Sequence, residues 1–143
     1  MTQINANGIT LEVETMGSRE NPAVLLVMGL GAQMTAWPED FCKQLSERGY
    51  FVIRFDNRDV GLSTWFDDAG EPNMSRTYLS ALFGRKIKAP YSLSDMADDA
   101  VGVLDSLGID KAHLIGASMG GMIVQRFALN HPERVSSLCS IMS

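Results

Sequence analysis

The chain has 143 residues, a formal net charge of −5 at pH 7, 45% hydrophobic residues and 20% charged residues. This is an ordinary composition for one globular domain spanning residues 1–143, and the acidic balance argues against nucleic acid as a partner. No apolar run is long enough to cross a membrane and no charged leader with an apolar core is visible, so a cytoplasmic protein without membrane contact is expected.

The two cysteines lie far apart in the sequence. Cys42 and Cys139 have neither a metal-binding nor a redox spacing. Both are therefore expected to be free thiols in a reducing compartment.

The first elements in chain order are a hairpin and a buried strand. Asn7-Gly8 separates two alternating runs, which is a strong signal for an antiparallel hairpin. Along residues 9–14, apolar side chains alternate with Thr10, Glu12 and Glu14, so one face of the strand is expected to be buried and the other wet. Residues 23–28 are apolar throughout, as in a central strand covered on both faces.

A glycine-containing loop, residues 29–33, follows that strand. A dinucleotide-binding G-x-G-x-x-G fingerprint would need glycine at Met34 and a helix beginning there at once, so that interpretation fails. The loop is either a plain turn or the carrier of an oxyanion donor. In the second interpretation, the donor is the backbone N–H of Leu30.

The next unit is a helix and a strand. Residues 39–48 form the helix, Gly49 ends it, and residues 51–55 form a strand parallel to the previous one. Asp56 follows at the carboxyl end of this strand, where it could act as a catalytic acid. We favour a structural role, in which an aspartate and an arginine hold a tight turn through charge-assisted hydrogen bonds.

Between Thr64 and Tyr91 the apolar residues follow neither a helical nor a strand periodicity, and a long loop with one short helical turn is expected. The cationic run at residues 85–88 is interpreted as a solvated part of it.

A second amphipathic helix is predicted over residues 93–107, capped by Ser92 or Ser94 and closed by a glycine. Its adjacent aspartates, Asp98 and Asp99, resemble an acidic site. The preferred interpretation is that both lie on the solvated face, where the helix dipole favours them.

The segment Gly116-Ala117-Ser118-Met119-Gly120-Gly121 lies between an apolar strand, residues 112–115, and a helix, residues 122–129. A serine at such a turn, with Gly116 two residues before and Gly120 two residues after, matches the nucleophile elbow. A side chain at either glycine would collide with its neighbours. The serine hydroxyl is then exposed, and the Met119 N–H at the helix start can bind an oxyanion. The alternative is a Gly-rich connection in which the serine caps the helix.

A last strand is predicted over residues 135–142. The alternation of strands and helices predicts an α/β fold: a mostly parallel sheet of about six strands with an antiparallel hairpin at its start. The last strand is expected at an open sheet edge, where self-association or pairing with a complementary C-terminal half is favoured. Only the helix over residues 39–48 is expected to cover one face of the sheet.

Five segments together resemble the N-terminal core of α/β-hydrolase-fold serine hydrolases, and among them most closely the small-ester hydrolases of the aclacinomycin methylesterase type. The segments are residues 26–31, 37–38, 54–63, 113–121 and 131–135. Two positions depart from the family: Met28 stands where many members carry histidine, and Asp59 where many carry glycine. The resemblance implies attack by Ser118 on a small-molecule ester, an acyl-enzyme, an oxyanion held by the N–H groups of Leu30 and Met119, and no metal or organic cofactor.

The catalytic acid and histidine are missing from the sequence. In this fold both follow the serine in the chain, and here no acid–histidine pair that could reach Ser118 follows it. His113 precedes Ser118 by five residues on a strand, so it lies about 15 Å away. His131, at the far end of the following helix, lies about 20 Å away.

The resemblance implies that the missing residues lie beyond Ser143. The chain is then the first half of a hydrolase and inactive alone, whether as a truncated form, an incomplete gene or one piece of a split protein. The alternative is a non-catalytic binding or interaction module that retains the fold.

Overall fold

The protein is described by a computed structural model, which defines residues 1–66 and 89–143. Most of the expected loop between residues 64 and 91, with the cationic run at 85–88, lies outside the described residues. The strands are β1 (Thr2–Ala6), β2 (Ile9–Met16), β3 (Ala23–Val27), β4 (Phe51–Phe55), β5 (Ala112–Ala117) and β6 (Val135–Ile141). The helices are α1 (Glu39–Glu47), α3 (Leu93–Ser106) and α4 (Met119–Asn130), with single 3₁₀ turns η1 (Met34–Ala36) and η3 (Pro132–Arg134).

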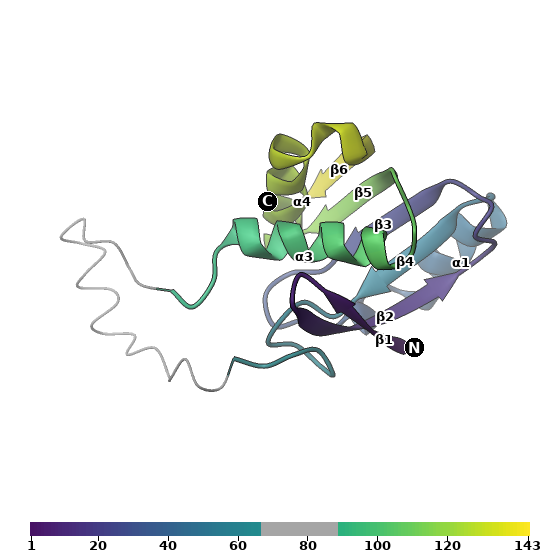
Figure 1. Ribbon diagram of the computed structural model, residues 1–143. Coiled ribbons are helices and arrows are strands. Elements are labelled where there is room, and N and C mark those ends of the chain that lie inside the picture. Colours follow the sequence, from purple (N-terminus) through teal and green to yellow (C-terminus); the bar gives the residue numbers. More distant parts are fainter. Residues whose placement is uncertain (67–88) are drawn as a thin grey trace.

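The six strands form one sheet in the order β1-β2-β4-β3-β5-β6 (Figure 1). β1 and β2 pair antiparallel, as do β2 and β4, whereas the pairs among β3, β4, β5 and β6 are parallel. The predicted fold class is therefore confirmed, and β6 lies at the edge of the sheet, as expected.

The two faces of the sheet are covered unequally. The larger core cluster, which includes Leu25, Leu104 and Phe127, lies between the sheet and the helices α3 and α4. The smaller cluster, which includes Leu26 and Cys42, lies under α1, the one helix that covers this face within residues 1–66 and 89–143. Figure 1 shows α3 in front of the sheet and α1 behind it. The expectation that α1 alone covers one face is confirmed.

The prediction that one face of β2 is exposed to solvent is wrong. Glu12 is buried and Glu14 is only half exposed. The residues after β4 cover this part of the strand: the Glu12 N–H donates to Ser63 Oγ, and the Glu12 carbonyl accepts from the Asp56 N–H. Glu14 accepts a hydrogen bond from Arg54 Nε at 2.6 Å. Alternation along one strand does not reveal a turn that folds back over it.

Ser92, one of the two expected caps, begins α3. Its hydroxyl accepts from the Asp95 N–H, and the Asp95 carboxylate accepts from the Ser92 N–H and hydroxyl, which makes a reciprocal capping box. The hydrogen bond from the Ser92 side chain, followed by that from its backbone, lowers the pKa of Asp95.

Replacing Ser92 by alanine is expected to lower the free energy of unfolding by about 1 kcal/mol at pH 7. Because the folded-state pKa of Asp95 is lowered, its contribution is complete above its ordinary pKa of about 4 and is lost as the pH falls through the folded value. Urea unfolding measures the difference in the free energy of unfolding between Ser92→Ala and the unsubstituted chain. This difference should be smaller at pH 3 than at pH 7. Ser94→Ala, at the rival cap position, is the control and should change little.

The prediction that Asp99 is solvated is wrong, because Asp99 is only 2% exposed. Its carboxylate accepts two hydrogen bonds of 2.6 Å from the guanidinium of Arg58, which is itself buried. Burial works against the positive charge, but the hydrogen bonds and the charge of Asp99 outweigh it and raise the pKa of Arg58. Asp98 remains half exposed, so the solvated interpretation fails for one of the two aspartates.

Two aromatic rings enclose the same guanidinium. The Arg58 Cζ lies 5.2 Å from the centre of the Phe66 ring and 4.8 Å from the centre of the Tyr91 ring. Asp59 holds both aromatic residues in place, because its carboxylate accepts a hydrogen bond from the Phe66 N–H at 2.6 Å and another from the Tyr91 hydroxyl. Burial, and then the hydrogen bond to Asp59, raise the pKa of Tyr91 to about 12. Phe66 and Tyr91, which lie on either side of positions 67–88 in the chain, therefore pack against the same side chain, that of Arg58.

Candidate active site

Ser118 lies at a sharp turn between β5 and α4. Its φ of 55° is in the left-handed region, which non-glycine residues rarely adopt, and its ψ is −124°. The side chain is exposed, and no side-chain capping hydrogen bond forms at the start of α4. The interpretation of Ser118 as a simple helix cap therefore fails, and its hydroxyl faces solvent above the carboxyl end of the strand.

Two glycines permit this turn because the backbone packs directly on itself there. A Cβ at Gly116 would lie 2.2 Å from the Gly120 carbonyl oxygen. A Cβ at Gly120 would lie 2.2 Å from the Val27 carbonyl oxygen. Real Cβ atoms do not approach backbone oxygens this closely, so no side chain fits at either position without movement of the main chain.

The loop after β3 lies against the serine. A Cβ built at Gly29 would be 3.1 Å from Ser118 Cβ and 3.5 Å from Ser118 Oγ. The neighbouring residue Leu30 is 81% exposed. Within residues 1–66 and 89–143, neither the Leu30 N–H nor the Met119 N–H donates a hydrogen bond. Both N–H groups therefore lack an acceptor among the described residues.

Asp56 takes the structural role that the sequence favoured. Its carboxylate accepts the Met34 N–H at 2.7 Å, at the start of η1, and the arginine of the same turn, Arg58, binds Asp99. Both residues thus make charge-assisted hydrogen bonds, as predicted, but these bonds join the turn to η1 and α3. Asn57, which the sequence did not single out, donates from Nδ2 to the Met28 carbonyl at 2.9 Å.

Both histidines are engaged elsewhere. His113 Nδ1 lies 2.7 Å from Ser137 Oγ, and its ring packs edge-on against Tyr50. His131 Nε2 lies 3.0 Å from Asp98 Oδ1. In the described part of the chain, no imidazole is hydrogen bonded to Ser118, as the distances along the strand and the helix predicted.

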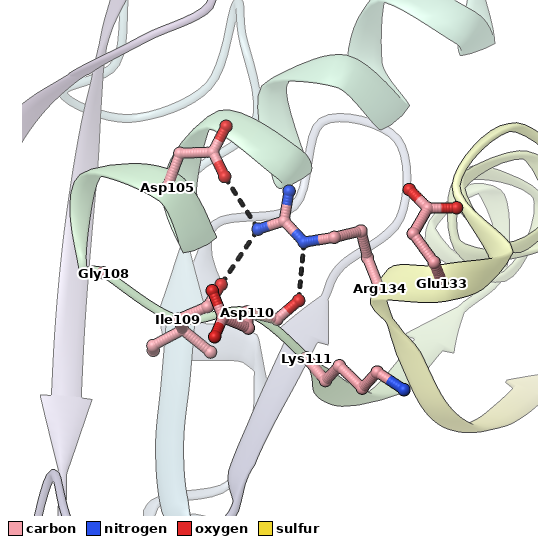
Figure 2. A pocket seen from close by; sticks show the side chains of 7 residues that line it. All are labelled: Asp105, Gly108, Ile109, Asp110, Lys111, Glu133 and Arg134. Atoms are coloured by element: carbon pink, nitrogen blue, oxygen red, sulfur yellow. Dashed lines mark hydrogen bonds and ion pairs between the residues drawn. The ribbon is translucent and has the colours of Figure 1, made fainter.

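A hollow of about 480 Å³ lies at the opposite ends of β5 and β6, away from Ser118 (Figure 2). Arg134 lines it; its Nε donates to the Asp110 carbonyl, and its Nη2 donates to the Asp105 carboxylate and the Ile109 carbonyl. Figure 2 shows these contacts converging on one guanidinium. The hollow is therefore formed around a structural arginine. None of the candidate site residues, Leu30, Gly116, Ser118, Met119 and Gly120, lines it.

The family follows from a comparison with known proteins. The family model for the alpha/beta hydrolase fold matches residues 22–143. The chain belongs to the α/β-hydrolase fold family. The predicted resemblance is therefore confirmed, and the turn at Ser118 occupies the strand–helix position at which this family's elbow motif occurs.

Similar proteins include two hydrolases and one solved hydrolase structure. A rhodomycin D methylesterase from a Streptomyces species is 33% identical over 94% of this chain and 39% of its own length. A putative carbamate hydrolase from Caulobacter segnis is 35% identical over 96% of this chain and 44% of its own length. The crystal structure of epoxide hydrolase A from Mycobacterium thermoresistibile superposes with a TM-score of 0.74 at 26% identity, over 96% of this chain and 37% of that one. The chain thus spans about two fifths of the length of these relatives.

The described residues, 1–66 and 89–143, contain neither a membrane-spanning helix nor a metal-binding cluster. No helix in these ranges combines the length and the hydropathy needed to cross a bilayer. The same ranges contain no cluster of three or more histidine, cysteine or acidic residues arranged to hold a metal ion. Both cysteines are free: Cys42 is buried, which raises its pKa, and Cys139 is exposed.

Proposed function

We propose that this chain carries the nucleophile and the oxyanion hole of a serine hydrolase that acts on carboxylic esters. Ser118 Oγ attacks the ester carbonyl carbon while a base takes its proton, and the tetrahedral intermediate expels the alcohol to leave an acyl-enzyme. Water then attacks the acyl carbon and frees Ser118. The N–H groups of Leu30 and Met119 hold the oxyanion, each lowering the barrier by about 3 kcal/mol.

The observation that carries this proposal is the exposed Ser118 at a φ of 55°, beside two backbone N–H groups without acceptors. A residue held in this strained conformation indicates function, because its side chain makes no capping hydrogen bond in return. The methylesterase and the carbamate hydrolase among the relatives favour an ester-like carbonyl as the target. No metal or organic cofactor takes part in this chemistry.

The acid and the base come from outside this chain. His113 and His131 are bound to Ser137 and Asp98, so neither can take the proton of Ser118 without leaving its partner. We therefore propose that the chain is inactive alone and that a complementary polypeptide completes the site by pairing along β6. β6 is an edge strand with five successive exposed residues, 136–140, which is a favourable template for such pairing and for self-association.

Labelling with a fluorophosphonate probe tests the nucleophile. The 143-residue chain alone is expected to label slowly or not at all. Labelling at Ser118 is expected when the C-terminal half of a related hydrolase is added as a separate polypeptide. Size-exclusion chromatography of the same mixture reports whether the two pieces pair, and Ser118→Ala, which changes only one exposed hydroxyl, should abolish the signal.

A non-catalytic binding module is the alternative function. The observation that favours it is the engagement of both histidines with other residues. Pairing with a C-terminal half but no labelling at Ser118 would support this alternative. Rapid labelling of the chain alone would instead overturn the proposal that its base lies elsewhere.

A further inference from the structure

Two buried polar side chains that follow β4 bind opposite ends of the loop that faces Ser118. We call residues 28–34 the oxyanion loop. At its start, Asn57 Nδ2 donates to the Met28 carbonyl at 2.9 Å. At its end, the Met34 N–H donates to Asp56 Oδ1 at 2.7 Å. Asp56 and Asn57 are 3% and 2% exposed, so the hydrogen bond of Asp56 is buried and that of Asn57, to the half-buried Met28, is partly buried.

The turn that presents these side chains is itself fixed to the sheet. The Asp56 N–H donates to the Glu12 carbonyl of β2 at 3.0 Å, and the Asp56 carbonyl accepts from Ser63 Oγ at 2.6 Å. Gly61 packs its backbone on the Asp56 carboxylate so closely that a Cβ there would lie 2.0 Å from Asp56 Oδ2. The carboxylate therefore has little freedom to move away from the Met34 N–H.

The middle of the oxyanion loop has few supports of its own. Leu30 and Gly31 are exposed, and the internal hydrogen bond of this stretch is the one from the Ala32 N–H to the Gly29 carbonyl at 3.3 Å. On the inner side, a Cβ built at Gly29 would lie 3.1 Å from Ser118 Cβ and 3.2 Å from the Ala117 carbonyl oxygen. The distance between the Leu30 N–H and Ser118 Oγ is therefore set mainly by the two ends of the loop.

We propose that Asp56 and Asn57 are positioning residues of the oxyanion hole, which hold the oxyanion loop from both ends so that the Leu30 N–H faces the substrate oxygen at Ser118. This inference rests on the function proposed above. An oxyanion donor acts only when it is held in place before the reaction, and a misplacement of about 1 Å can cost about 100-fold in rate. Neither side chain touches the reacting atoms.

Two substitutions remove the contacts, and two further variants serve as controls. Asn57→Asp keeps the shape of the side chain but turns a carboxylate oxygen toward the Met28 carbonyl, and Asp56→Ala removes the acceptor of the Met34 N–H. Asp56→Asn retains an acceptor oxygen and is the rescue variant. Asn7→Asp makes the same chemical change as Asn57→Asp at a side chain that does not contact the oxyanion loop, since the Asn7 amide donates to Asp99.

Amide hydrogen exchange of the 143-residue chain is the first readout, since it requires no activity. Asn57→Asp and Asp56→Ala are expected to speed exchange in the oxyanion loop about tenfold relative to β3 amides, as the loss of one shielded hydrogen bond predicts. Asp56→Asn and Asn7→Asp should leave this ratio within about twofold of the unsubstituted chain. An unchanged ratio in both test variants, or an equal change in Asn7→Asp, would overturn the proposal. If a variant is too unstable for residue-level exchange, mass spectrometry of peptides that cover the loop gives the same ratio.

Saturation kinetics of fluorophosphonate labelling, in the mixture with a C-terminal half, is the second readout. The maximal labelling rate is expected to fall about 100-fold in Asn57→Asp while the half-saturating probe concentration stays nearly constant. A rise in that concentration without loss of the maximal rate would contradict a positioning role. If Ser118 does not label at all, the proposed function fails, but the exchange result still decides whether Asp56 and Asn57 hold the loop.

Discussion

Replacing Gly120 by alanine is expected to lower the free energy of unfolding by about 3 kcal/mol. The new methyl group would lie 2.2 Å from the Val27 carbonyl oxygen and 2.8 Å from the Met28 carbonyl oxygen, so α4 or β3 must move to accommodate it. Either movement disturbs the larger core cluster, because α4 contributes three of its buried residues: Ile123, Val124 and Phe127. Urea unfolding followed by the fluorescence of the buried Trp37 measures the change.

Gly108→Ala is the matched control for this substitution. Gly108 has a φ of 69°, so alanine is strained there, but no atom lies within 4 Å of its would-be Cβ. Its cost is expected to be about 1 kcal/mol, from backbone strain alone. Equal losses in Gly108→Ala and Gly120→Ala would show that contact with the Val27 carbonyl is not what fixes glycine in the elbow.

Replacing Asp99 by alanine is expected to lower the free energy of unfolding by 3–5 kcal/mol, as is typical when one partner of a buried ion pair is removed. Arg58 would keep its charge in a buried position and lose two hydrogen bonds of 2.6 Å. The rings of Phe66 and Tyr91 face the guanidinium, but they cannot accept its N–H groups as a carboxylate does.

The double variant Arg58→Met/Asp99→Ala tests this explanation. Because it removes the charge together with its partner, it is expected to be more stable than Asp99→Ala alone. Asp105→Ala is the control: it removes a carboxylate that pairs with Arg134 near the surface, and its cost should be about 1 kcal/mol or less. A double variant as unstable as Asp99→Ala would mean that the unpaired charge is not the cause of the loss.

Elements defined by local pattern could be predicted closely from the sequence. The strand predicted over residues 51–55 coincides with β4, and the helix predicted over residues 39–48 differs from α1 by one residue. The turn at Ser118 was also predictable, because a strand, a serine between spaced glycines and a helix all occur within about twenty residues. Short-range sequence contains enough information for these elements.

Contacts between distant residues could not be predicted in this way. Asp99 lies among aspartates on a helix whose pattern is typical of a solvated face, and its partner Arg58 is 41 residues earlier. Asn57 binds a carbonyl 29 residues earlier, and the polarity of Asn57 is the only sign of this in the sequence. Buried polar pairs depend on which turns the fold brings together, and a periodicity along one element carries no information about that.

The stacking of Phe66 and Tyr91 on Arg58 brings two residues that are far apart in the chain against the same buried ion pair. Asp59 fixes both of them, through the Phe66 N–H and the Tyr91 hydroxyl. The pair of Arg58 and Asp99 is therefore screened from water by two rings, and the loss of either ring would raise the local dielectric constant and weaken the attraction between the two charges.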